Sequence, residues 1–187
     1  MKNKIISLFL KILIFSLISF YSYSSEQNWK PAQEGNKIIL IRHSLAPGGG
    51  DPTGFKVDDC KTQRNLNQTG IYQSKKIGKL FKSKKIPIDQ VLSSQWCRCK
   101  DTAKYAFGDY KEFTALNSTF QSSFNKNEAS QLKEIYNFVG KWNGNGKNLV
   151  LITHYSIITA VTNAIPSSGE IVITDKNFNV ISTIVTD

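Results

Sequence analysis

Residues 37–44 have the sequence KIILIRHS, and this stretch decides the fold. Its apolar run shows no alternation with polar residues, which is typical of a strand buried on both faces of a parallel sheet. A second run of the same kind, KNLVLIT at residues 147–153, ends directly before His154. We therefore predict two parallel core strands, the first ending before His43 and the second before His154.

The rest of the chain alternates between extended and helical patterns. A short strand is predicted at residues 90–93 and a weaker fourth strand at residues 112–116. After Pro166 the sequence becomes β-branched and alternating, which predicts an edge hairpin of residues 170–174 and 178–185. Apolar faces at helical spacing predict four helices, over residues 69–85, 94–107, 128–142 and 156–164. This order predicts an α/β fold, a three-layer α/β/α domain with a mostly parallel central sheet.

The first residues of the chain predict a secretory signal. Three lysines lie around and after a first apolar stretch, an uncharged run follows at residues 12–20, and Ser22 and Ser24 form a small-x-small cleavage site. We predict a signal peptide over residues 1–24 and one secreted or periplasmic domain over residues 25–187, without stable membrane insertion after cleavage. The run is shorter than the roughly 20 apolar residues that cross a bilayer, but an uncleaved leader would anchor the protein in the membrane.

The charge of the chain indicates what kind of partner it binds. The formal charge is +10, and it falls only to +7 when the three lysines of the leader are removed. A basic protein attracts molecules that carry phosphate or acidic groups. The lysines are scattered over several segments, and those at residues 75–76 and 82–85 fit the solvent-exposed face of one predicted helix. We therefore expect a small phosphorylated substrate rather than nucleic acid.

Cys60, Cys97 and Cys99 follow the leader, and an oxidising compartment favours one disulfide among them. Bonding of Cys60 to either Cys97 or Cys99 would tie the long loop of residues 44–64 to the segment that carries Arg98. Zinc is the competing use of these thiols, but a CxC pair in a chain with only two histidines is a weak match to zinc-ligand spacing. We predict no metal and no cofactor.

Arginine is rare in this chain and is placed beside the histidines. Only three of the 24 basic Lys and Arg residues are arginines: Arg42 adjoins His43, Arg98 follows the third predicted strand, and Arg64 lies between them. The planar guanidinium grips phosphate or carboxylate oxygens at two points, which lysine cannot do. Ligands bind at the carboxyl ends of strands in open α/β sheets, so His43, Arg98 and His154 should meet there.

Four motifs in fixed order resemble the histidine phosphatase superfamily, whose best-known members are phosphoglycerate mutases. They are strand-Arg-His, Arg-x-Leu-x-x-x-Gly, Ser-Ser-x-x-x-Arg-x-x-x-Thr-Ala and strand-Thr-His, at residues 41–44, 64–70, 93–103 and 151–154. Each motif alone is weakly specific, but their order and spacing over residues 38–170 are strongly so. The chain departs from the family at Ser44, where glycine is commoner.

The resemblance implies a role for each matched residue. It makes His43 the nucleophile that becomes phosphohistidine, with Arg42 and Arg98 as phosphate ligands and His154 as the second histidine of the pocket. Arg64 matches a position at the pocket edge and is a further predicted phosphate ligand. Neutral His43 would present one ring nitrogen to phosphorus while a backbone acceptor holds the other. Such chemistry splits hydrolysis into two steps and requires no metal.

The proton donor for the leaving group is less well marked. The family commonly uses a Glu or Asp near the pocket, but here Asn117 and Ser118 follow the fourth predicted strand and Tyr155 follows the second histidine. Glu128, at the start of a predicted helix, is the first candidate; Asp51 and Glu112 come after it.

Together these features predict an exported, metal-independent phosphomonoesterase that acts through a phosphohistidine intermediate. The chain is similar to periplasmic members of the superfamily, which implies a small phosphorylated metabolite or a cell-envelope sugar as substrate. A mutase of glycolytic phosphates would lack its substrate outside the cytoplasm. Two alternatives remain: a phosphohistidine phosphatase, whose leaving group needs little acid assistance, and a non-catalytic protein that binds a phosphate ligand in the same pocket.

Overall fold

A computed structural model describes residues 26–186, so the predicted signal peptide lies outside the described part. Six strands form one sheet in the order β3-β2-β4-β1-β5-β6. The first four in this order are parallel, whereas β5 runs antiparallel to β1 and β6 antiparallel to β5. Their bounds are β1 Ile38–Arg42, β2 Ile88–Ser93, β3 Lys111–Glu112, β4 Asn148–Thr153, β5 Ile171–Thr174 and β6 Val180–Ile184. The sheet is thus mostly parallel and ends in the predicted C-terminal hairpin.

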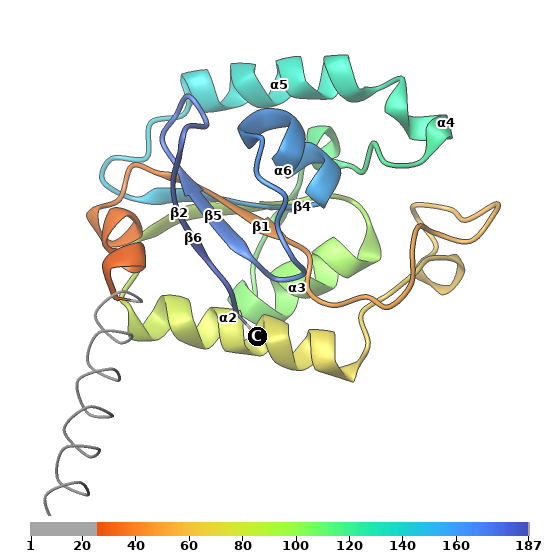
Figure 1. Cartoon of the computed structure of the whole chain (residues 1–187), viewed down its shortest axis with the longest axis horizontal. Helices are drawn as coiled ribbons and strands as arrows, with labels where there is room; N and C mark the ends of the chain where they lie inside the picture. Colours follow the sequence, from red (N-terminus) through yellow and green to blue (C-terminus); the bar gives the residue numbers. More distant parts are fainter. Residues whose placement is uncertain (1–25, 187) are drawn as a thin grey trace, which may run out of the picture.

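Helices cover both faces of this sheet (Figure 1). Helices α2 (Gln68–Ser83) and α3 (Cys97–Phe107) lie on one face, together with helical residues 26–34; α5 (Glu128–Lys141) and α6 (Tyr155–Thr162) lie on the other. Alternate residues of β1 enter the two cores, Ile39 the first and Ile38 the second. The three-layer α/β/α architecture is confirmed. None of the helices within residues 26–186 is both long and apolar enough to span a bilayer.

The fourth predicted strand, residues 112–116, is wrong over most of its length. Strand β3 ends at Glu112, and a 3-10 turn, η2 (Thr114–Leu116), follows it. Ala115 and Leu116 are both fully buried in the core beneath α5. Successive strand residues point to opposite faces, so two buried neighbours on one side require the chain to leave the extended form.

The topology brings the candidate residues to one edge of the sheet. Strands β2, β4 and β1 are neighbours, and Arg42 at the end of β1 pairs in register with Thr153 at the end of β4. His43 and His154 therefore follow adjacent parallel strands. Helices α6 and α3 begin at this same edge, with His154 as the N-terminal cap of α6 and Arg98 in the first turn of α3.

Candidate active site

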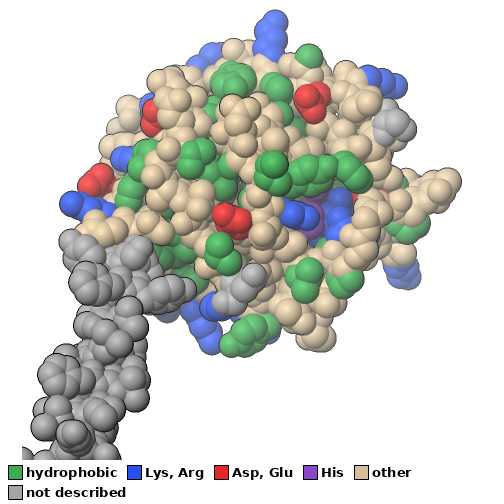
Figure 2. Space-filling view, viewed as in Figure 1, with side chains coloured by type: hydrophobic (Ala, Val, Ile, Leu, Met, Phe, Trp, Pro, Cys, Tyr) green, Lys and Arg blue, Asp and Glu red, His purple; other side chains and the backbone are tan. Residues whose placement is uncertain are grey.

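A cavity of about 110 Å³ lies at the carboxyl ends of the parallel strands. Figure 2 shows histidine at the base of a hollow flanked by basic side chains. The cavity is lined by Arg42, His43, Gly48, Gly49, Gly50, Asp51, Arg64, Arg98, Ser118, Phe120, Gln121, His154 and Tyr155. The structure thus brings both histidines and all three arginines together, and it does not bring Glu128 to the cavity.

His43 is held in the form that a nucleophile needs. Its Nδ1 lies 2.8 Å from the carbonyl oxygen of Ser44. A carbonyl only accepts hydrogen bonds, so Nδ1 carries the proton and Nε2 keeps its lone pair. Burial, followed by the positive charge of Arg98, holds the pKa of His43 well below its usual value. The imidazole is therefore neutral at neutral pH, with Nε2 available to attack.

Ser44 fits its position because hydroxyl groups of two helices surround it. Its backbone N–H donates to Oγ1 of Thr102 in α3 over 3.0 Å, and Ser74 of α2 donates to its hydroxyl over 2.8 Å. Ser44 is fully buried. These contacts fix the chain directly after β1, where it leaves the extended form, so that Arg42 and His43 both line one cavity.

All five N–H groups of Arg98 have acceptors. Nε donates to Nε2 of His43 (3.2 Å), and one hydrogen of Nη2 faces Nδ1 of His154 (3.5 Å). The other hydrogen of Nη2 and one of Nη1 bind the two carboxylate oxygens of Asp51 at 3.1 and 2.8 Å. The last hydrogen of Nη1 donates to the backbone oxygen of Arg64 over 3.3 Å. The Nε–Nη2 edge of the guanidinium therefore faces both histidines.

Asp51 binds Arg98 in the cavity, a contact that the sequence did not predict, since Asp51 appeared there only as a trailing candidate for the proton donor. Its carboxylate also accepts from the backbone N–H of Arg64 and the indole N–H of Trp96, both over 2.9 Å. Burial alone would raise the pKa of Asp51, but the hydrogen bonds and charge of Arg98 hold it below its usual value. Asp51 is an anion here.

His154 is in the other tautomer, with its proton on Nε2 rather than on Nδ1. Arginine only donates hydrogen bonds, so Nδ1 of His154 accepts from Arg98 and Nε2 carries the proton. Nε2 then donates to Oγ of Ser94 (3.0 Å), which in turn donates to Asn117 (3.1 Å). Burial and then Arg98 hold the pKa of His154 well below its usual value. His154 therefore donates to a bound phosphate only after it takes up a proton, which the charge of the anion favours.

Arg42 and Arg64 both line the cavity, but they have different partners. Nη1 of Arg42 donates to the carbonyl of Pro166 over 2.9 Å, but its buried Nε has no hydrogen-bond partner among residues 26–186. Its guanidinium lies 5.5 Å from the ring centroid of Tyr155. Arg64 instead donates to the carbonyls of Ala46 and Gly50 and so holds the glycine loop. Arg42 thus has a guanidinium nitrogen without an acceptor among the described residues, whereas Nε and Nη1 of Arg64 bind loop carbonyls.

The other candidate acids lie outside the cavity. Glu128, the first residue of α5, accepts a hydrogen bond from Oγ1 of Thr119 over 2.9 Å. Glu112 is exposed on β3 and pairs with Lys100 at 3.4 Å. Among the described residues that line the cavity, Asp51 is the only carboxylate.

A disulfide joins the loop to the helix that carries Arg98. Cys60 bonds to Cys97, the first residue of α3, which settles the pairing that the sequence left open. Cys99 is free and buried, with its sulfur 3.4 Å from Nε2 of His154. Burial raises the pKa of the Cys99 thiol to about 12, so it stays protonated at neutral pH.

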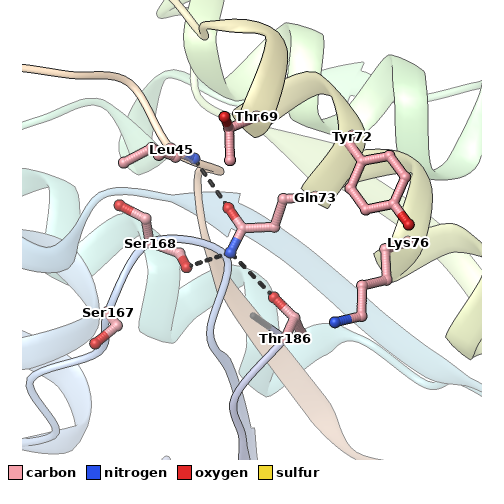
Figure 3. A pocket seen from close by; sticks show the side chains of 8 residues that line it. All are labelled: Leu45, Thr69, Tyr72, Gln73, Lys76, Ser167, Ser168 and Thr186. Atoms are coloured by element: carbon pink, nitrogen blue, oxygen red, sulfur yellow. Dashed lines mark hydrogen bonds between the residues drawn. The ribbon is translucent and has the colours of Figure 1, made fainter.

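A larger cavity of about 610 Å³ lies beside α2, and none of the predicted site residues lines it. Figure 3 shows Gln73 among the residues that line this cavity. Its side chain accepts from the backbone N–H of Leu45 (3.0 Å) and donates to the backbone oxygen of Ser168 (2.8 Å) and to Oγ1 of Thr186 (3.3 Å). Gln73 thereby connects the loop after His43 to the segment before β5. These hydrogen bonds of Gln73 help to hold the loop after His43 in place.

Comparisons with known proteins establish the class of fold. No family model matches the chain, and no curated protein matches it. Among solved structures, the putative phosphohistidine phosphatase SixA from Agrobacterium tumefaciens has a TM-score of 0.57 at 16% identity, covering 81% of this chain and 99% of that one. A phosphoglycerate mutase from Thermus thermophilus has a TM-score of 0.54 with the same identity and coverage. The chain therefore has the histidine phosphatase fold.

Proposed function

We propose that this protein is a phosphatase that passes the phosphoryl group of its substrate through Nε2 of His43 to water. One observation carries the proposal: His43 presents an unprotonated Nε2 to a cavity walled by guanidinium groups. Two fold neighbours, described as a phosphohistidine phosphatase and a phosphoglycerate mutase, support the same chemistry.

The reaction proceeds in two displacements. Nε2 of His43 attacks phosphorus, the bond from phosphorus to the leaving group breaks, and an N–P bond forms. Water then attacks phosphorus and the N–P bond breaks, which releases orthophosphate and returns neutral His43. The Nε–Nη2 edge of Arg98 and the guanidinium of Arg42 meet the charge on the equatorial oxygens, with protonated His154 as a third donor.

We propose a phosphate monoester of a small metabolite or a cell-envelope sugar as substrate. The predicted leader and the basic charge of the chain support this proposal. We further propose that the enzyme is exported and needs no metal, because guanidinium groups supply the positive charge at phosphorus. The mature protein should then begin at Ser25, which N-terminal sequencing of the secreted or periplasmic fraction measures.

One observation favours phosphohistidine as the alternative substrate. No described carboxylate in the cavity can protonate a leaving group, because Asp51 is the only one among the described lining residues and it is ionised. An alkoxide needs such a proton, whereas an imidazole protonated by solvent leaves as a neutral ring. Comparing kcat/KM for glycerol phosphate and for phosphoimidazole separates the two candidates, because only the first substrate needs the enzyme to supply acid.

The test of the proposal is turnover of p-nitrophenyl phosphate by the purified protein in the presence of EDTA. Quenching in alkaline detergent should trap a phosphate on His43 that is stable in base and lost in acid. The variant His43→Ala should lose both turnover and trapping, and equal turnover by this variant would refute the nucleophile. Tight orthophosphate binding without turnover by the wild type would instead support a phosphate-binding protein.

A further inference from the structure

We infer that Asp51 is the residue that positions Arg98 for phosphoryl transfer, and that it acts as a permanent anion rather than as the proton donor. The inference rests on the proposed phosphatase function. Its basis is the way in which two edges of one guanidinium are divided between Asp51 and the histidines.

The end-on edge of Arg98, formed by Nη1 and Nη2, is taken by Asp51 at 2.8 and 3.1 Å. The side edge, formed by Nε and Nη2, faces Nε2 of His43 and Nδ1 of His154. A planar fork cannot turn one edge without moving the other. Asp51 therefore fixes the direction of the two donors that would bind the phosphoryl oxygens between the histidines.

Asp51 is itself immobile, which a positioning residue requires. Besides the two bonds from Arg98, its carboxylate accepts from the backbone of Arg64 and from the indole of Trp96. Its side chain is only 1% exposed, and its own carbonyl accepts from Gln121 over 3.2 Å. The loop and the start of α3 thus hold the carboxylate, and Gln121 holds the backbone of the same residue.

The same contacts argue against proton donation by Asp51. To reach a leaving group, the carboxylate would have to break four hydrogen bonds and leave a buried guanidinium unpaired. Breaking a buried ion pair in this way is strongly unfavourable, because it leaves an uncompensated buried charge. A donor must also be protonated, and Arg98 favours the ionised form of Asp51.

The test compares Asp51→Asn with the wild type on p-nitrophenyl phosphate and on phenyl phosphate, which has the poorer leaving group. Asparagine keeps the size of the side chain, but its amide N–H₂ faces the donors of Arg98 or Trp96, so the guanidinium moves. We expect kcat to fall about 100-fold, the cost typical of misplaced reacting groups. The factor should be the same for both substrates, because positioning does not depend on the leaving group.

Asp58→Asn is the matched control, since Asp58 is an exposed carboxylate of the same loop. It should keep wild-type kcat on both substrates. If Asp51→Asn fails to fold, Asp51→Glu keeps the charge and the ion pair while shifting Arg98, and the same equal loss on both substrates is expected of it.

The outcomes separate the inference from the proposed function. A loss confined to phenyl phosphate would make Asp51 the proton donor and overturn the inference, and unchanged kcat in a folded Asp51 variant would also overturn it. No turnover and no phosphohistidine in the wild type would instead refute the phosphatase function, whatever the Asp51 variants do.

Discussion

Nε of Arg98 donates a hydrogen bond to Nε2 of His43 over 3.2 Å, so the proposed nucleophile and the proposed main phosphate ligand contact each other directly. An entering phosphoryl group has to come between these two atoms, where it accepts from Arg98 as His43 attacks. The rigid edge of the guanidinium is therefore matched to the position at which charge develops.

Arg98→Lys tests this match. Lysine keeps the positive charge beside Asp51 but offers a point charge in place of an edge with two donors. We expect kcat on p-nitrophenyl phosphate to fall about 100- to 1,000-fold, as for removal of a preorganised donor. Arg64→Lys is the control, because the donors of Arg64 bind loop carbonyls, and its loss should be below about tenfold. Similar losses in both variants would contradict the special role of the Arg98 edge.

The low pKa values of His43 and His154 predict the pH dependence of the rate. Burial and Arg98 hold both pKa values well below 6.5, so both imidazoles are still neutral at pH 6.5. Expressed per substrate monoanion, which carries the proton that His154 takes up on binding, kcat/KM should stay flat from pH 8 down to pH 6.5 and decline only below that. A decline centred at or above pH 6.5 would contradict a buried, neutral nucleophile.

The same two pKa values predict how stability depends on pH. Between its folded pKa and about 6.5, each histidine binds more protons in the unfolded chain, so the free energy of unfolding rises with pH. Stability should therefore be lost as the pH falls from 6.5 toward the folded pKa values. Urea unfolding at several pH values measures this slope, which should be shallower in the variant His43→Gln, where one of the two groups no longer titrates.

The disulfide predicts a redox dependence of both stability and activity. Cys60 and Cys97 are separated by 37 positions, and their bond ties the loop of Asp51 and Arg64 to the start of α3. Such a crosslink contributes about 3 kcal/mol by restricting the unfolded chain. Reduction, or Cys60→Ser, should lower the free energy of unfolding by about this amount and reduce kcat by loosening Asp51. Cys99→Ser controls for the general loss of a thiol and should keep the redox response.

The sequence predicted that His43, His154 and Arg98 lie together, because the pattern of the two core strands left few other arrangements for them. An apolar run without alternation is typical of strands buried on both faces of a parallel sheet, and parallel strands end at one edge. His43 and His154 follow two such strands, so their convergence was predictable without any knowledge of the loops. The rarity of arginine then indicated Arg98 as their partner.

The path of the loop that carries Asp51 and the rotational phase of α3 could not be predicted from the sequence. The loop that carries Asp51 turns at Gly48, Gly50 and Gly54, whose φ angles are positive at 95°, 77° and 77°, and hydrophobic periodicity does not encode such turns. Which of Cys97 and Cys99 bonds to Cys60 depends on where α3 begins. At about 100° per residue the two side chains point roughly 200° apart, so only one of them can face the loop.

Gly70 and Gly140 form a matched pair that tests how the Arg-x-Leu-x-x-x-Gly motif supports the site. Asn67 caps α2 through the backbone N–H of Gly70 (2.8 Å), and a Cβ at Gly70 would lie 2.1 Å from the carbonyl oxygen of Leu45. Because Leu45 lies two residues after His43, Gly70→Ala must displace the loop that holds the nucleophile. We expect it to cost about 1–3 kcal/mol of stability, the range typical of overpacking, and to lower kcat at least tenfold.

Gly140→Ala should have the opposite effect on stability. Gly140 is an exposed residue of α5, and a Cβ there meets nothing within 4 Å. Replacing glycine by alanine inside a helix stabilises it by about 0.5–1 kcal/mol, because the unfolded chain loses freedom. Urea unfolding and p-nitrophenyl phosphate turnover of both variants measure the contrast, with Gly140→Ala more stable and fully active. If Gly70→Ala matched it in stability and in rate, close packing of α2 against the chain at Leu45 would not be what holds His43 in place.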